Sequence, residues 1–101
     1  MDRIWLQQYP QGIPAEADIA AHASLRELVE HSMERFRALP AYSNMGVTLT
    51  YDDLDRRSRE FGAFLQKKLG LAKGDRIALM MPNLLQYPVA LFGTHRAGGI
   101  V

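Results

Sequence analysis

The clearest pattern of apolar and polar positions lies in residues 24–40, SLRELVEHSMERFRALP. Apolar side chains recur there every three or four positions, which is the spacing of one face of an α-helix. They are Leu25, Leu28, Val29, Met33 and Phe36. Ser24 and Glu27 fit a capping box at the start of this helix, and Pro40 predicts its end. His31 lies off the stripe, which favours a solvated histidine over a ligand.

Residues 41–50, AYSNMGVTLT, predict a short β-hairpin whose chain reverses at 44–46, where a glycine can take a positive φ. A second amphipathic helix is predicted for 50–70. Thr50 and Asp53 form a plausible N-cap pair, and a glycine follows the last turn. The buried side of this helix is expected to carry Leu54, Phe61, Leu65 and Leu69.

A dense charge cluster, DDLDRRSRE, occupies positions 52–60 of the second predicted helix. Its acidic and basic residues are spaced to form i,i+4 ion pairs along one helix: Asp52–Arg56, Asp53–Arg57 and Asp55–Arg59. Such pairs contribute a few tenths of a kcal/mol each on a helix surface. The cluster is therefore interpreted as a solvated, self-paired face and not as a functional site.

The C-terminal third predicts a strand, a helix and the start of another strand. Positions 76–81 are almost wholly apolar, as expected of a strand that is covered on both faces. Asn83 is a candidate N-cap, with Gln86 three residues on, for a helix over 84–97 that is apolar nearly all round. Residues 100–101 begin a second strand. The pattern predicts a right-handed βαβ crossover that is cut short.

The first 23 residues are predicted to form an irregular arm, because Pro10, Gly12 and Pro14 interrupt regular structure. Trp5 and Tyr9, with the neighbouring leucine, are its large apolar groups. We expect them to pack on the rest of the domain or on a neighbour. Contact with a membrane surface is the alternative.

Composition narrows the class of protein. The chain has 101 residues, a formal charge of +1 and no cysteine. A balanced charge gives no nucleic-acid footprint, and the lack of cysteine excludes disulfides, a thiol nucleophile and a Cys-based zinc site. The opening residues do not have the form of a secretory signal, and no apolar run approaches the ~20 residues that span a bilayer. We expect a cytoplasmic protein that is at most peripheral at the inner face of the membrane.

No chemical motif is complete. Gly93 and Gly98 have Walker A spacing, but Gly99 and Ile100 stand where the motif needs Lys and Ser or Thr. A helix start at Asn83 could attract an anion, as any helix start can. The three histidines, His22, His31 and His95, are far apart in sequence and form no metal-binding pattern. The residues therefore predict no catalytic, cofactor-binding or metal-binding group in this chain.

Several stretches resemble the start of bacterial long-chain fatty acid–CoA ligases, in the AMP-forming acyl-adenylate superfamily. TYDDL at 50–54, KGDRIAL at 73–79 and MPN at 81–83 match the order in which that superfamily opens. The run MMPNLLQYPVALFG at 80–93 is the most specific. The resemblance implies that residues 24–101 are the incomplete start of a large α/β AMP-binding domain. Members are several times longer, so an N-terminal fragment is expected.

The resemblance also implies the activity of the longer protein: ATP, magnesium and coenzyme A convert a long-chain fatty acid to its CoA thioester through an acyl-adenylate. In the family, the groups for this chemistry lie downstream, and none is matched here. The chain alone is expected to be inactive and to self-associate. Two alternatives stay open, namely the start of another acyl- or aryl-adenylating ligase and a self-standing small α/β interaction domain.

Overall fold

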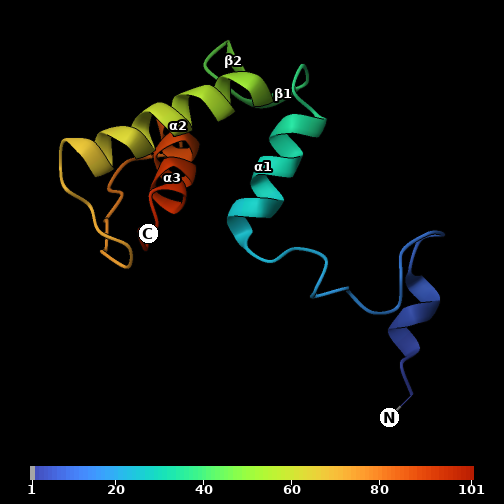
Figure 1. Cartoon of the computed structure of the whole chain (residues 1–101). Coiled ribbons are helices and arrows are strands. Elements are labelled where there is room, and N and C mark those ends of the chain that lie inside the picture. The colour runs from blue at the N-terminus through green and yellow to red at the C-terminus, as the bar shows by residue number, and fades with distance from the viewer. Residues whose placement is uncertain (1) are drawn as a thin grey trace.

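The computed structural model describes residues 2–101 and shows a small α/β arrangement. In chain order, its elements are η1 (Ile4–Gln8), α1 (Leu25–Arg35), β1 (Pro40–Asn44), β2 (Val47–Thr50), α2 (Tyr51–Lys67) and α3 (Gln86–Arg96). Figure 1 shows α2 crossing α3, with α1 beside this pair and the short 3₁₀ helix η1 at the far end of the arm.

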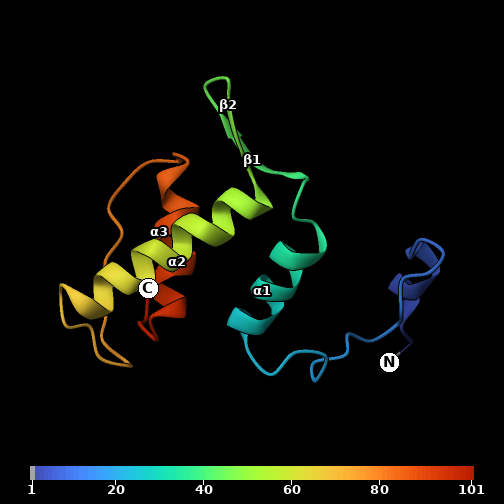
Figure 2. The ribbon, with the colours of Figure 1, turned by 45° about the horizontal axis from the view of Figure 1, so that its top comes forward.

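The core lies where the three α-helices meet and where the hairpin joins them. Its fully buried apolar side chains come from every one of these elements and from the turn after α3: Met33, Leu49, Leu54, Leu65, Ala90 and Ala97. Helix α1 contacts both α2 and α3, and Figure 2 shows it to one side of this pair. The helix pair α2–α3 is therefore the base on which the other elements are placed.

Helix α1 begins as predicted but ends earlier. Ser24 Oγ accepts the N–H of Glu27 at 3.1 Å, and Glu27 Oε2 accepts the N–H of Ala23 at 2.5 Å. The helix ends at Arg35, so the prediction that Pro40 ends it is wrong, and Pro40 instead begins β1. Of the predicted apolar stripe, only Met33 is fully buried; Leu25, Leu28 and Phe36 are exposed. Helical spacing identified the apolar face but not how much of it finds a partner.

The hairpin is confirmed. Strands β1 and β2 pair antiparallel, with Asn44 opposite Val47. The two residues between them, Met45 and Gly46, have φ angles of 49° and 79°. Two successive positive φ angles are typical of the two-residue turns whose twist matches that of a hairpin.

The start of α2 is also confirmed. Thr50 Oγ1 accepts the N–H of Asp53 at 3.1 Å, and Asp53 Oδ2 accepts the N–H of Thr50 at 3.2 Å, which completes a capping box. The pKa of Asp53 lies below its usual value. The main cause is the hydrogen bond from the backbone N–H of Thr50, and the second is the hydrogen bond from the Thr50 hydroxyl. The predicted buried side is correct for Leu54 and Leu65, whereas Leu69 lies beyond the helix and is exposed.

The predicted buried strand at 76–81 is wrong. Within residues 2–101, Arg76 forms a single parallel bridge, to Ile100, and 77–81 continue as extended chain without a strand partner. Ile77 donates its N–H to the carbonyl of Ile100 at 2.8 Å. Met80 is 94% exposed. The parallel direction agrees with the predicted crossover, but a buried strand needs neighbours on its edges and faces that this chain does not supply.

Helix α3 begins later than predicted. Its N-cap is Leu85, and no described side chain caps it, so the predicted N-cap at Asn83 with Gln86 is wrong. The carbonyl of Asn83 instead accepts the side-chain N–H of Asn44 at 2.5 Å, which ties this turn to the hairpin. Pro88 lies in the first turn of α3, where a missing N–H costs no helical hydrogen bond.

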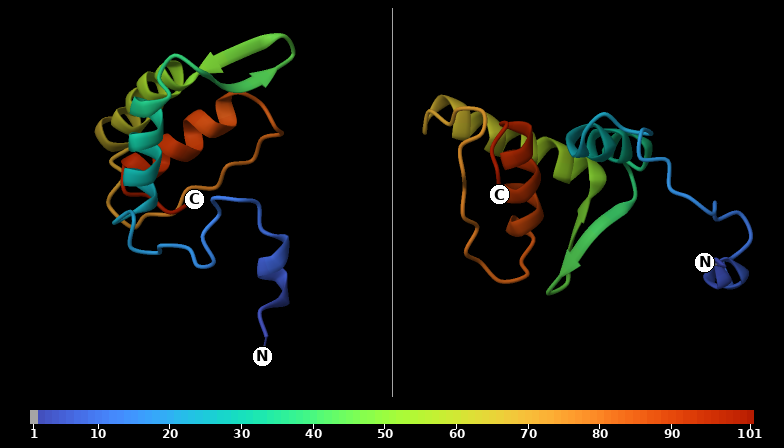
Figure 3. Two further views of the ribbon diagram at one scale, coloured as in Figure 1. Left: turned by 90° about the vertical axis from the view of Figure 1, so that its right-hand side faces the viewer. Right: turned by 90° about the horizontal axis from the view of Figure 1, so that it is seen from below.

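The arm contains one regular element where the sequence predicted none, namely η1. An ion pair between Arg3 and Glu16, at 2.6 Å, closes the arm on itself. Trp5 is 48% exposed and Tyr9 is 41% exposed, and both views of Figure 3 show η1 away from the helices. The expected packing of these aromatic groups on the rest of the chain is therefore absent from the described residues; Met1 lies outside them.

Candidate functional site

Arg96, near the end of α3, is a charged side chain that is almost completely buried. Its side chain is only 8% exposed, although it carries a full charge. The guanidinium donates to Asp55 Oδ1 of α2 at 2.5 Å and contacts the sulfur of Met33 in α1 at 3.2 Å. Its Nε lies 3.7 Å from Glu30 Oε1, too far for a hydrogen bond, and has no partner among residues 2–101. We call Arg96, Asp55, Met33 and Glu30 the Arg96 junction, because these residues join all three helices.

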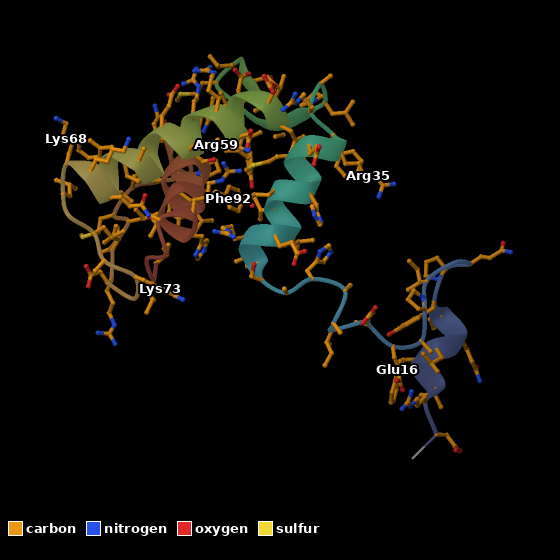
Figure 4. The ribbon with its side chains drawn as sticks, in the orientation of Figure 1. Glu16, Arg35, Arg59, Lys68, Lys73 and Phe92 are labelled. Atoms are coloured by element: carbon orange, nitrogen blue, oxygen red, sulfur yellow. The ribbon has the colours of Figure 1, made fainter. Side chains whose placement is uncertain are left out.

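Asp55 is the acidic centre of this junction. It accepts a second hydrogen bond from Arg59 Nε at 3.0 Å, and Figure 4 shows Arg59 on α2 near α1. Burial raises the pKa of Asp55, but the hydrogen bonds from Arg59 and Arg96 outweigh that effect and hold the pKa below its usual value. Both arginines donate to the same oxygen, Oδ1, and two cations on one carboxylate favour its ionised form.

The charge cluster of α2 therefore differs from the prediction. Of the three expected i,i+4 pairs, only Asp55–Arg59 forms. Asp52 instead pairs with Arg37 after α1, at 3.1 Å, and Asp53 pairs with Arg56 at 3.3 Å. Asp55 is 15% exposed, so the face is not simply solvated. Helical spacing could not show that Arg96, 41 residues away, completes the network.

The Arg96 junction is suited to hold the three helices together. Its charged groups bind one another and are not directed at a ligand site. A polar hollow of about 380 Å³ borders it between α1 and α2. Its walls carry both signs of charge: Glu30, His31, Glu34, Arg37, Asp55 and Arg59. Across residues 2–101, no three His, Asp or Glu side chains are grouped so that they could hold a metal ion.

Gly93, the first of the two glycines with Walker A spacing, has a packing role instead. Gly93 lies inside α3 against α2, where an added Cβ would be 2.8 Å from Phe61 Cδ1 and 2.8 Å from the carbonyl oxygen of Ser58. Gly62 faces it from α2, where an added Cβ would be 3.0 Å from the carbonyl oxygen of Gly93. The pair lets the two helices approach closely. Because Gly93 lies within a helix, it does not belong to a phosphate-binding loop.

The histidines do not form a common site in the described residues. His22 and His31 approach, with ring centroids 5.8 Å apart, which their spacing in the sequence did not predict. His95 lies in the last turn of α3, facing α1 beside Phe92. Figure 4 shows Phe92 between these helices. His31 is exposed, as expected for a solvated residue.

A groove of about 610 Å³ lies between the hairpin, α2 and the start of α3. Its apolar walls are formed mainly by Val47, Leu49, Phe61, Leu84, Leu85 and Val89. Arg57 and Glu60 also line it. We call this the hairpin groove. Periodicity could not find it, because its walls come from three separate parts of the chain.

The chain belongs to the family of AMP-binding enzymes, which it matches over residues 29–101. It is 56% identical over all 101 residues to the long-chain-fatty-acid–CoA ligase of Salmonella typhimurium, of which it covers 18%. It is 39% identical over 97 residues, 96% of the chain, to the protein of that name from Bacillus subtilis, of which it covers 17%.

Another relative is the salicyl-AMP ligase / salicyl-S-ArCP synthetase of Mycobacterium tuberculosis, 46% identical over 52 residues. That match covers 52% of this chain and 9% of the relative. No solved structure matches the chain significantly. The resemblance stated from the sequence is thus confirmed: the chain is homologous to the N-terminal part of long-chain-fatty-acid–CoA ligases and spans less than a fifth of their length.

Proposed function

We propose that this chain is the opening part of a long-chain fatty acid–CoA ligase, in which it serves as scaffold for the AMP-binding domain. The observation that carries the proposal is the 56% identity over all 101 residues to a ligase of that name. The structure supports a scaffolding role, since Arg96 and Gly93 both lie at contacts between helices.

In the proposed reaction of the longer protein, a fatty acid carboxylate attacks the α-phosphate of ATP and pyrophosphate leaves. The thiolate of coenzyme A then attacks the acyl carbon of the adenylate, and AMP leaves as the thioester forms. Magnesium would support the first step. The described residues offer no group of three or more ligands for it. No stretch of the sequence matches the phosphate-binding or adenylating motifs that the resemblance implies, so we assign no residue of this chain to ATP, magnesium or coenzyme A.

A second candidate is an aryl-adenylating ligase, favoured by the partial match to the salicyl-AMP ligase. That match covers 52 residues of the chain, whereas the match to the fatty acid enzyme covers 101. The longer match favours the fatty acid as substrate. Comparing palmitate with salicylate as substrates of the longer protein separates the two candidates.

The proposal expects residues 1–101 alone to catalyse no ATP–pyrophosphate exchange above a blank without enzyme, with palmitate or any other fatty acid. The physical reason is that adenylation needs positioned cations and donors around the phosphates, and the proposal places these groups in the rest of the longer protein. The longer protein from the same reading frame serves as the positive control and should exchange with palmitate. Exchange by a rigorously purified 1–101 sample would contradict the assignment of the chemistry to the rest of the protein.

We also propose that the isolated 101 residues self-associate. Large apolar side chains near the C-terminus are exposed, with Met80 at 94%, Ile100 at 50% and Val101 at 45%. The extended chain at 77–81 also offers unpaired backbone groups, and an open edge is a template for another chain. Sedimentation at micromolar concentration should give a mass above the 11.4 kDa of one chain. A monodisperse monomer would argue against this and favour a self-standing domain.

For location, we propose that the longer protein works in the cytoplasm, with at most peripheral contact at the inner face of the membrane. In residues 2–101, no helix is both long and apolar enough to cross a bilayer. Trp5 and Tyr9 are exposed, which leaves them available for such contact. The side chains of the arm include three acidic residues, Asp2, Glu16 and Asp18, and one arginine, Arg3. This excess of negative charge disfavours binding to anionic lipid.

A further inference from the structure

The hairpin groove leaves apolar surface uncovered on a small domain. Val47 is 57% exposed and Leu84 is 38% exposed, and both face the groove. The groove is held open by fixed elements, because the side-chain N–H of Asn44 binds the carbonyl of Asn83 beside it. Figure 3 shows the hairpin and the turn before α3 projecting to the same side of α2. A contiguous apolar surface of this kind usually has a partner.

The direction of the chain at its end points toward this groove. Ile100 donates its N–H to the carbonyl of Asp75, and Ile77 donates to the carbonyl of Ile100, both at 2.8 Å. This bridge to Arg76 is parallel, so a continuing strand runs alongside 77–81 toward Pro82. At roughly 3.3 Å per residue, about six residues beyond Ile100 bring the chain level with Pro82, next to the rim of the groove at Leu84.

We propose that the hairpin groove is an internal interface, covered by the stretch of polypeptide that follows Val101 in the longer protein. The inference rests on the proposed function, because it takes the chain as 18% of a protein with the length of its relatives. The incoming segment would add its strand to the open edge at 77–81 and then place apolar side chains between β2 and α3. The same contact would cover Met80 and Leu84.

The charges at the groove favour this occupant over a free carboxylate ligand. Among residues 2–101 the groove lining holds one charge of each sign, Arg57 and Glu60, and so no cluster of positive charge that would favour an anion. Glu60 is itself paired with Arg56 at 3.5 Å, in the exposed part of α2. An apolar stretch of the same polypeptide needs no charge at the rim, and its attachment at Val101 lowers the entropic cost of docking.

Cysteine labelling tests the proposal, because the chain contains no cysteine. Val47 and Thr48 are neighbours in β2 and both are exposed, but successive strand residues point to opposite faces, and only Val47 lines the groove. The variants Val47→Cys and Thr48→Cys are made in residues 1–101 and in the longer protein. The rate of maleimide labelling is read at each site by peptide mass spectrometry.

We expect Val47→Cys to label at least about tenfold more slowly in the longer protein than in residues 1–101, since a covered site reacts only through local opening. Thr48→Cys should label at similar rates in both. Equal labelling of Val47→Cys in both proteins would overturn the proposal, as would protection of both positions, which would mean that the whole hairpin is enclosed. Protection of Val47→Cys in residues 1–101 that rises with concentration would identify a second copy as the occupant.

The labelling result and the test of the proposed function can fail independently of each other. Palmitoyl-CoA formation by the longer protein tests the function, whereas labelling tests the groove. An active ligase with an open groove would refute the interface alone. A covered groove in a protein without ligase activity would refute the function alone.

Discussion

Replacing Asp55 by alanine is expected to lower the free energy of unfolding of residues 1–101 by about 3 kcal/mol. Arg96 would stay buried at 8% exposure, with Glu30 Oε1 the nearest remaining carboxylate oxygen, 3.7 Å from its Nε. An uncompensated charge at such a site costs far more than the pair itself contributes. The measurement is urea denaturation followed by circular dichroism, at one fixed protein concentration.

The matched control is Asp52→Ala on the same helix. Asp52 and its partner Arg37 are 57% and 64% exposed, so this loss should cost less than about 1 kcal/mol. The double variant Asp55→Leu with Arg96→Met should recover much of the stability, because it removes both buried charges together. A cost for Asp55→Ala no larger than that of the control would show that Glu30 replaces Asp55, contrary to the role argued for the junction.

The same residue gives the expected pH dependence. The folded pKa of Asp55 lies below its usual value of 3.8, so its stabilising contribution is fully present above that value. It is lost as the pH falls through the folded pKa. Stability should therefore fall more steeply below about pH 4 in the unmodified chain than in Asp55→Ala. Asp53 contributes with the same sign in both proteins, so the difference between them reports Asp55.

Replacing Gly93 by alanine should lower the free energy of unfolding by about 2 kcal/mol, although alanine is the better helix former by about 1 kcal/mol. The new Cβ would lie 2.8 Å from the carbonyl oxygen of Ser58, and that backbone atom cannot yield without moving α2 away from α3. Thermal and urea unfolding measure the loss.

Gly62→Ala is the control on the facing helix. Its Cβ would approach the carbonyl oxygen of Gly93 at 3.0 Å, and its next contacts lie at 3.7 Å or more. We expect a clearly smaller loss there. If Gly93→Ala were neutral or stabilising, the close approach of the two helices would not set their spacing.

The elements that the sequence predicted well are those whose causes are local. The turn at Met45–Gly46 and the capping box of Thr50 and Asp53 depend on residues within three positions of one another. The family resemblance depends likewise on contiguous stretches. These features need no knowledge of the rest of the fold.

Two errors were local, the end of α1 and the N-cap at Asn83, but the larger ones arise where the cause lies far along the chain. The strand at 76–81 was predicted from its apolar content, but a strand forms only where another pairs with it, and here the pairing stops at Arg76. The junction of Asp55 with Arg96 spans 41 positions, so the i,i+4 spacing of Asp55 and Arg59 was the only visible signal. The hairpin groove needs three elements to be placed before it exists at all.

The join between the hairpin and α2 has a mechanical consequence. Thr50 ends β2 and Tyr51 begins α2, so no residue between them can act as a hinge. The segment after α1 also binds the start of α2. Tyr51 donates its N–H to the carbonyl of Leu39 at 3.1 Å, and Asp52 donates its N–H to the carbonyl of Arg37 at 3.0 Å. The hairpin is thus joined directly to the first turn of α2. Because no linker residue lies between them, we expect a displacement of the hairpin to be passed to the first turn of α2.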